Sequence, residues 1–472
     1  MKKNNSVCIY ISLGLFLTMF LSLIIYICSF YATNKEQLIN NTYNKHEKTL
    51  LTQNLRGDIY SADGVLLAYS VQNDDGSQTR IYPYGSMFAH SVGYSSKGKA
   101  GIELEANYYL ANSDQLALQK AGNYNSSQLN KGNSVNSTLD FKLTQIADEY
   151  LGNYKGAVIV TNVKTGEILT LVSHPGFDPN NIDQIWDSLI NDANNSSLLN
   201  RATSGKYPPG STFKIVSALE YYRENGEKKC EKYVFDCPGY FNDGVNSIKC
   251  FHGTVHGNVD LRLSFAKSCN SSFANIGMSL NKKKFSKTLD DLMFNQNIDI
   301  GIPTIKSTIY VSKDTSDYDM MQTSIGQGTT SISPIHLNMI TMAIANNGVL
   351  MKPYMVSSAQ NTLGMPLYTN KPKQYTKLIS SSESEYLTSL MMDVVEEGTA
   401  TKLKSNIYTA AGKTGSAEYN NRGDSHAWFT GFAPADDPEI AVTIIIEAGG
   451  TGGERAVPLA KLLFDDYFER EN

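Results

Sequence analysis

A serine and a lysine three positions apart, Ser211 and Lys214, could act as a nucleophile and its base. They stand in the stretch YPPGSTFKIVSALEYY, where Pro208 and Pro209 end any preceding helix and an apolar run follows. Residues three apart share one face of a helix, so a helix beginning near Ser211 would bring the lysine amine within reach of the hydroxyl. A serine and lysine in that arrangement can catalyse acyl transfer through a covalent intermediate.

The same pair has a purely structural alternative. Ser211 could be the N-cap of the helix and Lys214 a solvated side chain, and on four residues alone that interpretation is favoured. The S-x-x-K spacing also occurs elsewhere in the chain, at Ser96–Lys99, Ser264–Lys267 and Ser279–Lys282. The spacing by itself is therefore a weak signal, and catalysis needs support from other motifs.

Two further motifs follow in chain order. Residues 268–270 spell S-x-N and residues 413–415 spell K-T-G, and the three motifs together are far more specific than any one of them. An earlier K-T-G at residues 164–166 lies between two apolar runs, where its glycine would serve a turn. We therefore interpret the first copy as structural. The second is flanked by small residues that would let a ligand approach the backbone.

The elements that must position these motifs can be read from hydrophobic periodicity. FKLTQIADEYLG predicts an amphipathic helix, and GAVIVTNVKTGEILTLVS predicts two strands around a turn. SPIHLNMITMAIANNG predicts a helix with Ser333 as N-cap and Pro334 in its first turn. The last strand is expected at Glu439–Gly449. This pattern predicts an α+β domain with a mainly antiparallel sheet that begins near Val135.

The N-terminal part is of a different kind. No charged residue occurs from Asn4 to Asn34, and residues 7–30 are apolar enough to cross a bilayer as one helix. A cleaved signal peptide is the alternative, but the apolar core is too long and the cleavage signal is poor. Lysines precede the span, so the tail is expected to be cytoplasmic and everything after residue 32 to lie outside. The polar stretch that follows predicts a small, irregular module.

Bulk composition excludes some functions. The 472 residues are 41% hydrophobic and 18% charged, with a net charge of −5, which suits one large domain and a smaller one. Neither this acidic balance nor any long basic run supports binding to nucleic acid.

Six cysteines are too few for a disulfide scaffold. Cys8 and Cys28 fall in the apolar span, which leaves Cys230, Cys237, Cys250 and Cys269 for the rest of the chain. Together with His252 and His256 these could surround zinc, although the spacing fits no standard finger. One disulfide or free thiols is the favoured interpretation, and no residue is assigned as a metal ligand.

Several segments of the chain together resemble a known family. The segments NRATSGKYPPGSTFK, SCNSSFA, IGQG, GKTGSAE and AWFTGFAP resemble the transpeptidase domain of class B penicillin-binding proteins, and LRGDIYSADGVLLA resembles the start of their pedestal. The resemblance covers nearly the whole chain, with a short pedestal and an unusual Cys269 in S-x-N. It implies a tail at 1–6, a membrane anchor at 7–30, a pedestal at 33–134, and a transpeptidase domain of the penicillin-binding and serine β-lactamase fold at 135–472.

The resemblance also implies a reaction. The enzyme would be a serine D,D-transpeptidase that cross-links peptidoglycan stem peptides, binds β-lactams, needs no cofactor and works beside a membrane glycan polymerase of the SEDS type. The residues that match the family's motifs would be Ser211 as nucleophile, Lys214 as its base, Ser268 as proton relay, Asn270 as a support for the lysine and the substrate, and Lys413, Thr414, Gly415 and Ser416 as the binding strand.

Three alternatives compete with this interpretation. A class A β-lactamase needs a glutamate between S-x-N and K-T-G, and the chain has none from Lys232 to Ser382. A penicillin sensor needs a cytoplasmic signalling domain, for which about six residues before the span are too few. A D,D-carboxypeptidase shares every motif, and the sequence leaves that alternative open.

Overall fold

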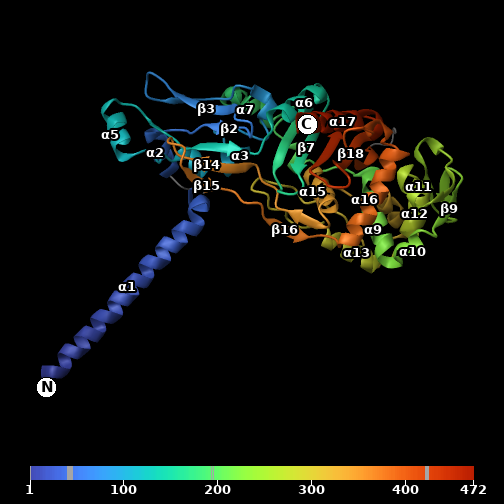
Figure 1. Ribbon diagram of the computed structural model, residues 1–472, viewed down its shortest axis with the longest axis horizontal. Helices are drawn as coiled ribbons and strands as arrows, with labels where there is room; N and C mark the ends of the chain where they lie inside the picture. The colour runs from blue at the N-terminus through green and yellow to red at the C-terminus, as the bar shows by residue number, and fades with distance from the viewer. Residues whose placement is uncertain (1, 40–45, 193, 195, 420–424, 472) are drawn as a thin grey trace.

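The computed structural model describes residues 2–39, 46–192, 194, 196–419 and 425–471. Its first helix, α1 (Lys2–Ile39), projects away from the rest of the molecule (Figure 1). Within α1, residues 7–30 have a mean hydropathy of 2.4 and exposed side chains. A helix of this length can cross the roughly 30 Å hydrocarbon core of a bilayer, in agreement with the predicted anchor. Met1, at the start of the predicted tail, lies outside the described residues.

The larger part of the chain is built on a five-stranded sheet, and its antiparallel pairing agrees with the prediction. Its strands run in the order β17-β18-β19-β7-β8. The bounds are β7 (Gly156–Asn162), β8 (Ile168–His174), β17 (Ala411–Glu418), β18 (Ser425–Ala433) and β19 (Ile440–Ile446). The expected pair of strands and the expected last strand are therefore present. The first K-T-G forms the turn between β7 and β8, where Gly166 has a φ of +83°.

Helices cover both faces of this sheet. One face carries α6 (Phe141–Leu151) and α17 (Gly452–Glu471), and the other carries α15 (Pro334–Ala345) with the short α8 (Arg201–Ser204). The predicted helices α6 and α15 are confirmed, and α15 is buried along its whole length. The C-terminal helix α17 was not anticipated from the sequence. The sheet is thus enclosed, which explains why β18 and β19 are continuous runs of buried residues.

A group of helices packs beside the sheet and contributes the remaining walls of the site (Figure 1). They are α9 (Lys214–Asn225), α10 (Glu227–Cys230), α11 (Leu261–Ala266), α12 (Asn270–Ser279), α13 (Lys282–Asp291), α14 (Asp317–Ser324) and α16 (Ser381–Glu396). Between α10 and α11 lie four short strands: β9 (Val234–Cys237), β10 (Tyr240–Asn242), β11 (Ser247–Lys249) and β12 (Gly257–Asp260).

The N-terminal module is a second sheet in the order β15-β14-β6-β2-β3-β4. It joins β2 (Ile59–Tyr60), β3 (Leu66–Gln72), β4 (Gln78–Ile81) and β6 (Ser134–Ser137) to β14 (Val356–Gln360) and β15 (Pro366–Thr369), which come from far along the chain. Val135, the predicted domain boundary, pairs with both Ile59 and Ala359. The two parts of the molecule therefore share a sheet across that boundary.

The rest of this module consists of short elements around the sheet. They are α2 (His46–Gln53), β1 (Asn54–Leu55), α3 (Gly101–Glu105), α4 (Asn107–Ala111), α5 (Ala117–Asn125) and β5 (Asn130–Lys131). Buried Glu103 accepts hydrogen bonds from Arg56 at 2.6 Å and Arg80 at 2.7 Å. Both arginines hold the pKa of this carboxyl below its usual range, against the opposing effect of burial.

Candidate active site

Ser211 lies in a tight turn directly before helix α9. Residues Gly210–Phe213 form a 3-10 turn and the α-helix α9 begins only at Lys214, three residues later than the sequence indicated. Pro209 takes the N-cap position, so the interpretation of Ser211 as the N-cap is wrong.

The turn is held against the sheet by its backbone. Gly210 has a φ of +52°, and a Cβ built on it would lie 2.9 Å from the Ser416 carbonyl oxygen. Glycine is therefore needed both for the left-handed conformation and for the close approach to β17. The amide of Gly210 donates to the carbonyl of Gly326 at 2.9 Å, and the Trp428 indole donates to the carbonyl of Pro208 at 3.1 Å.

Lys214 stands at the centre of the cluster. Its Nζ lies 2.8 Å from Ser211 Oγ, 2.7 Å from Asn270 Oδ1, and 3.0 and 3.2 Å from the carbonyl and hydroxyl oxygens of Ser268. The side chain is completely buried, and its amine sits 5.7 Å from the ring centre of Phe273. Burial lowers the pKa of Lys214 to about 7, because the charged form loses its hydration.

Ser268 links the two lysines. Its hydroxyl oxygen accepts from Lys214 and also from Lys413 at 3.1 Å. Ser268 has a φ of +59°, a conformation that costs free energy for any residue with a side chain and is often found at functional sites. Asn270 opens α12, where its amide nitrogen donates to the Lys249 carbonyl at 3.1 Å and so orients its oxygen toward Lys214.

Lys413 projects from β17 and is also fully buried. Burial and the neighbouring Lys214 amine lower its pKa well below the usual range. The following residue, Thr414, forms a side-chain hydrogen bond with Thr399. A Cβ built on Gly415 would lie 3.1 Å from the Pro209 carbonyl oxygen and from a Thr212 methyl, so a small residue is needed where β17 passes the turn.

These groups line one cleft of about 1110 Å³. Its walls include residues from the 3-10 turn, the S-x-N segment, β17, the segment between α10 and α11 and the loop after α14, among them Ser211, Ser268, Asn270, Thr414, Gly415, Ser416, Lys249, His252 and Gln327. All eight predicted site residues therefore lie in or directly beneath a single cleft. The geometry suits attack by Ser211 on a carbonyl group of a substrate. The lysines beside the cleft suit a substrate that also carries an anionic group.

Lys267, Lys282 and Lys164, from other copies of the motifs, make different contacts, although Lys267 also lines the cleft. The amine of Lys267 donates to the carbonyl of Glu397, and that of Lys282 donates to the carbonyl of Thr315 at 2.7 Å. Lys164 of the first K-T-G is half exposed and forms an ion pair with Asp437 at 2.8 Å.

Sequence reasoning missed several residues that complete the site. Thr399 contacts Thr414, the Lys249 carbonyl orients Asn270, and Phe265 lies 5.5 Å beneath the Lys413 amine. None of these has a local signal, because each acts through a contact between distant parts of the chain. Ile325 and Gln327 of the IGQG segment and Glu418 of the GKTGSAE segment also line the cleft, and these lie in stretches that the sequence singled out.

Comparisons with known proteins identify related domains over most of the chain. Residues 156–465 match the family model described as the penicillin binding protein transpeptidase domain, and residues 56–135 match the penicillin binding protein A dimerisation domain. The chain is 31% identical to the peptidoglycan D,D-transpeptidase PbpA of Mycolicibacterium smegmatis, with 86% of this chain and 87% of that protein covered.

Solved structures show the same fold. The D,D-transpeptidase domain of a peptidoglycan glycosyltransferase from Eggerthella lenta aligns with a TM-score of 0.79 and 30% identity, over 89% of this chain and 99% of that one. Penicillin-binding protein A from M. tuberculosis, solved as an imipenem acyl-enzyme complex, aligns with a TM-score of 0.79 and 26% identity, over 88% and 99%. With a family model that matches more than half of its length and a relative of this identity, the chain belongs to the penicillin-binding protein transpeptidase family.

Proposed function

We propose that this chain is a membrane-anchored serine D,D-transpeptidase that cross-links peptidoglycan stem peptides and is acylated by β-lactams. The observation that supports this most directly is the meeting of Ser211, Lys214, Ser268 and Lys413 at hydrogen-bond distances in one cleft. The acyl-enzyme complex of the M. tuberculosis relative supports the same chemistry.

The first step is acylation of Ser211. Its hydroxyl attacks the carbonyl between the two terminal D-alanines, and neutral Lys214 accepts the hydroxyl proton. The distance of 2.8 Å and the lowered pKa of Lys214 support this role as base. Ser268, in contact with both lysines, relays a proton to the departing amine, so that D-alanine leaves and an ester remains on Ser211.

The second step transfers the acyl group. The amine of a neighbouring stem peptide attacks the ester carbonyl and loses its proton to the Lys214 and Ser268 pair, and the Ser211 hydroxyl is restored. Through the close approach of Gly210 to Ser416, the backbone amides of Ser211 and Ser416 form the oxyanion hole for both tetrahedral intermediates.

Lys413 and Thr414 receive the terminal carboxylate of the substrate. A carboxylate beside Lys413 favours its charged form and so reverses the effect of burial on its pKa. A charged Lys413 in turn disfavours a charge on Lys214, which shares the Ser268 hydroxyl with it. Substrate binding therefore helps to keep Lys214 neutral, the form that is needed to accept a proton.

In this proposal the chain is organised as a tail at 1–6, an anchor at 7–30, a pedestal at 33–134 and the transpeptidase domain at 135–472. The lysines before the span favour a cytoplasmic tail, which places the domain outside the membrane. The partner is a SEDS-type glycan polymerase in the same membrane, contacted mainly through the pedestal. Gly14 is the only glycine of the span, so close helix packing of the GxxxG kind is not favoured.

A D,D-carboxypeptidase is the second candidate, because water could replace the acceptor amine at the same acyl-enzyme. Two carboxylates that could activate water, Glu418 and Glu454, line the cleft. Neither lies between S-x-N and K-T-G, the interval in which class A β-lactamases place their deacylating glutamate.

Labelling of full-length protein with a fluorescent penicillin tests the acyl-enzyme. We expect one covalent adduct per chain, mapped by peptide mass to Ser211, and none in Ser211→Ala. Ser279→Ala is the matched control, because Ser279 belongs to another S-x-x-K copy and its hydroxyl donates to the Ile276 carbonyl within α12. An adduct that persists in Ser211→Ala, or that maps to Ser264 or Ser279, would contradict the assignment.

A further inference from the structure

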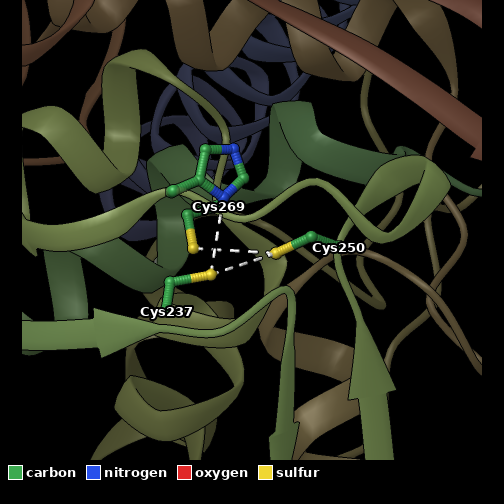
Figure 2. Close-up of side chains that lie close together, drawn as sticks. Cys237, Cys250 and Cys269 are labelled. Atoms are coloured by element: carbon green, nitrogen blue, oxygen red, sulfur yellow. Dashed lines mark hydrogen bonds between the residues drawn. The ribbon is translucent and has the colours of Figure 1, made fainter.

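We propose that Cys237, Cys250, His256 and Cys269 form a structural zinc site that supports the catalytic S-x-N segment. The four residues come from the end of β9, the position directly after β11, the loop before β12 and the N-cap of α12. Figure 2 shows the three sulfur atoms facing one another across this junction. Their ligand atoms, with a nitrogen of His256, all lie within 4.8 Å of each other.

The distances fit a tetrahedral metal centre. Sγ of Cys250 lies 3.7 Å from that of Cys237 and 3.8 Å from that of Cys269, and Cys237 Sγ lies 3.5 Å from His256 Nδ1. A tetrahedron with metal–sulfur bonds of about 2.3 Å and a metal–nitrogen bond of about 2.0 Å has edges of about 3.8 and 3.5 Å. Disulfide sulfurs would be only about 2.0 Å apart, so the geometry favours a shared metal over a bonded pair.

The surroundings of the sulfurs suit thiolates. The backbone amide of Ser272 points at Cys269 Sγ at 3.4 Å, and the amide and hydroxyl of Ser271 lie 3.5 and 3.0 Å from Cys250 Sγ. These donors come from the first turn of the ten-residue helix α12, whose N-terminal dipole also favours negative charge. Hydrogen bonds of this kind orient metal ligands and stabilise them.

The donor set selects zinc. Three thiolates and one imidazole form a closed, four-coordinate site of the type that structural zinc occupies. Binding of Zn²⁺ to three thiols and a neutral histidine would release three protons and leave a centre with a net charge of −1. The sequence favoured free thiols or one disulfide, although Cys269 was among the residues that could surround zinc. Tertiary packing decides that Cys269 and His256 belong to the set and that Cys230 and His252 do not.

The module between α10 and α11 needs such a cross-link. Its strands are mostly exposed, and the buried side chains of residues 231–260 are Cys237, Ile248, Cys250 and Val259. A segment that buries so few apolar groups cannot hold itself together by a hydrophobic core. A metal held by Cys237 and Cys250 would take the place of that core.

Two ligands adjoin catalytic groups. Cys269 stands between Ser268 and Asn270, and Cys250 follows Lys249, whose carbonyl holds the Asn270 amide. The metal would therefore fix both sides of the contact that aims Asn270 at Lys214. This positioning role rests on the proposed function, whereas the metal site itself does not.

Metal analysis of the full-length protein in detergent micelles tests the site. We expect one zinc per chain in the wild type, and loss of zinc in Cys237→Ser and His256→Ala. Cys230→Ser and His252→Ala are the matched controls and should retain zinc. Cys230 is a buried cysteine and His252 an exposed histidine, and both lie outside the cluster.

Spectroscopy keeps the test independent of how well the variants fold. Wild type that is stripped by a chelator and reloaded with Co²⁺ should show thiolate-to-cobalt charge transfer and the visible bands of a tetrahedral centre. A disulfide among Cys237, Cys250 and Cys269, bound iron or copper in place of zinc, or a folded wild type that binds no metal would overturn the proposal.

Acylation tests the positioning role. Removal of zinc should slow acylation by a fluorescent penicillin by about tenfold or more, and added zinc should restore the rate. An unchanged rate in the zinc-free protein would overturn this part. Ser211→Ala should keep its zinc while it loses labelling, so a failure of the metal site and a failure of the proposed reaction give different results.

Discussion

At the residue scale, the reactivity of the cleft depends on a buried amine that contacts four oxygen atoms. A lysine in this setting loses its proton more easily, because burial penalises the charged form more than the neutral one. The conformation of Ser268, with its positive φ, places one hydroxyl between Lys214 and Lys413. The same three side chains can therefore bind an anion and move a proton.

The pH dependence of acylation follows from Lys214. Its pKa is lowered to about 7, so the neutral base is the minor form below that pH and the major form above it. We expect the acylation rate constant to rise as the pH increases through about 7 and then to level off. Stopped-flow labelling at a series of pH values measures this. A flat profile, or a rate that falls across the same interval, would contradict the assignment of Lys214 as base.

Substitution of Lys413 and of Lys164 tests which of the two K-T-G motifs is functional. Lys413→Ala removes a buried partner for the substrate carboxylate, and loss of a hydrogen bond to a charged group costs about 1.5–3 kcal/mol, or about ten- to a hundredfold in rate. Lys164→Ala removes only an exposed ion pair with Asp437 and should leave acylation unchanged. Rates for both variants, with thermal unfolding as a check on folding, measure the difference. The reverse result would show that the wrong motif was chosen.

At the scale of elements, the site is a junction between β17 and a 3-10 turn that are about two hundred residues apart in the chain. Glycines on both sides allow the backbones to meet, since a Cβ at Gly210 or Gly415 would contact the opposite segment. The loop that contains Gly326 holds the turn in place, because the Gly326 carbonyl accepts a hydrogen bond from the Gly210 amide. The position of Ser211 is therefore set by packing around the turn and not by α9 alone.

Gly326→Ala tests this support. A Cβ at Gly326 would lie 2.1 Å from the Gly210 carbonyl oxygen, which forces the turn to move. We expect acylation to fall by about tenfold or more and the melting temperature to drop. Gly364→Ala is the matched control, because Gly364 also has a positive φ, of +77°, but has open space around its Cβ position. The control should show only the backbone cost of about 1–2 kcal/mol. Equal acylation rates in the two variants would contradict the role of the Gly326 contact.

At the scale of the whole molecule, the apolar helix α1 projects from the small sheet module, and the five-stranded sheet with its helices lies beyond that module (Figure 1). The module between anchor and catalytic domain has about 100 residues, less than a glycan polymerase domain would need. It also shares its sheet with β14 and β15, so hydrogen bonds between strands join it to a segment from far along the chain.

A coupled reaction tests the division of labour. Full-length protein supplied with lipid-linked disaccharide pentapeptide should polymerise no glycan alone, and should form dimeric muropeptides when a SEDS-type polymerase is added. Ser211→Ala should abolish the dimers while the polymerase still makes glycan. Glycan made by this chain alone would contradict the proposal. Release of D-alanine without dimers would favour the carboxypeptidase alternative.

Much of this protein could be predicted from its sequence, because several of its signals are local. The anchor depends on an apolar run, α6 and α15 on helical periodicity, and the β7–β8 hairpin on two apolar runs around a glycine turn. The order of S-x-x-K, S-x-N and K-T-G was also visible in the chain, and it led to the residues that line the cleft.

Only the tertiary structure decided which copies of these motifs meet. Ser264–Lys267 and Ser279–Lys282 have the same spacing as Ser211–Lys214, yet their lysines bond distant carbonyls, because contacts with other segments determine where a side chain points. The cysteine cluster is also determined by tertiary contacts. Its four ligands come from separate short elements that pack against α12, and no rule that acts within a few residues of sequence could bring them together.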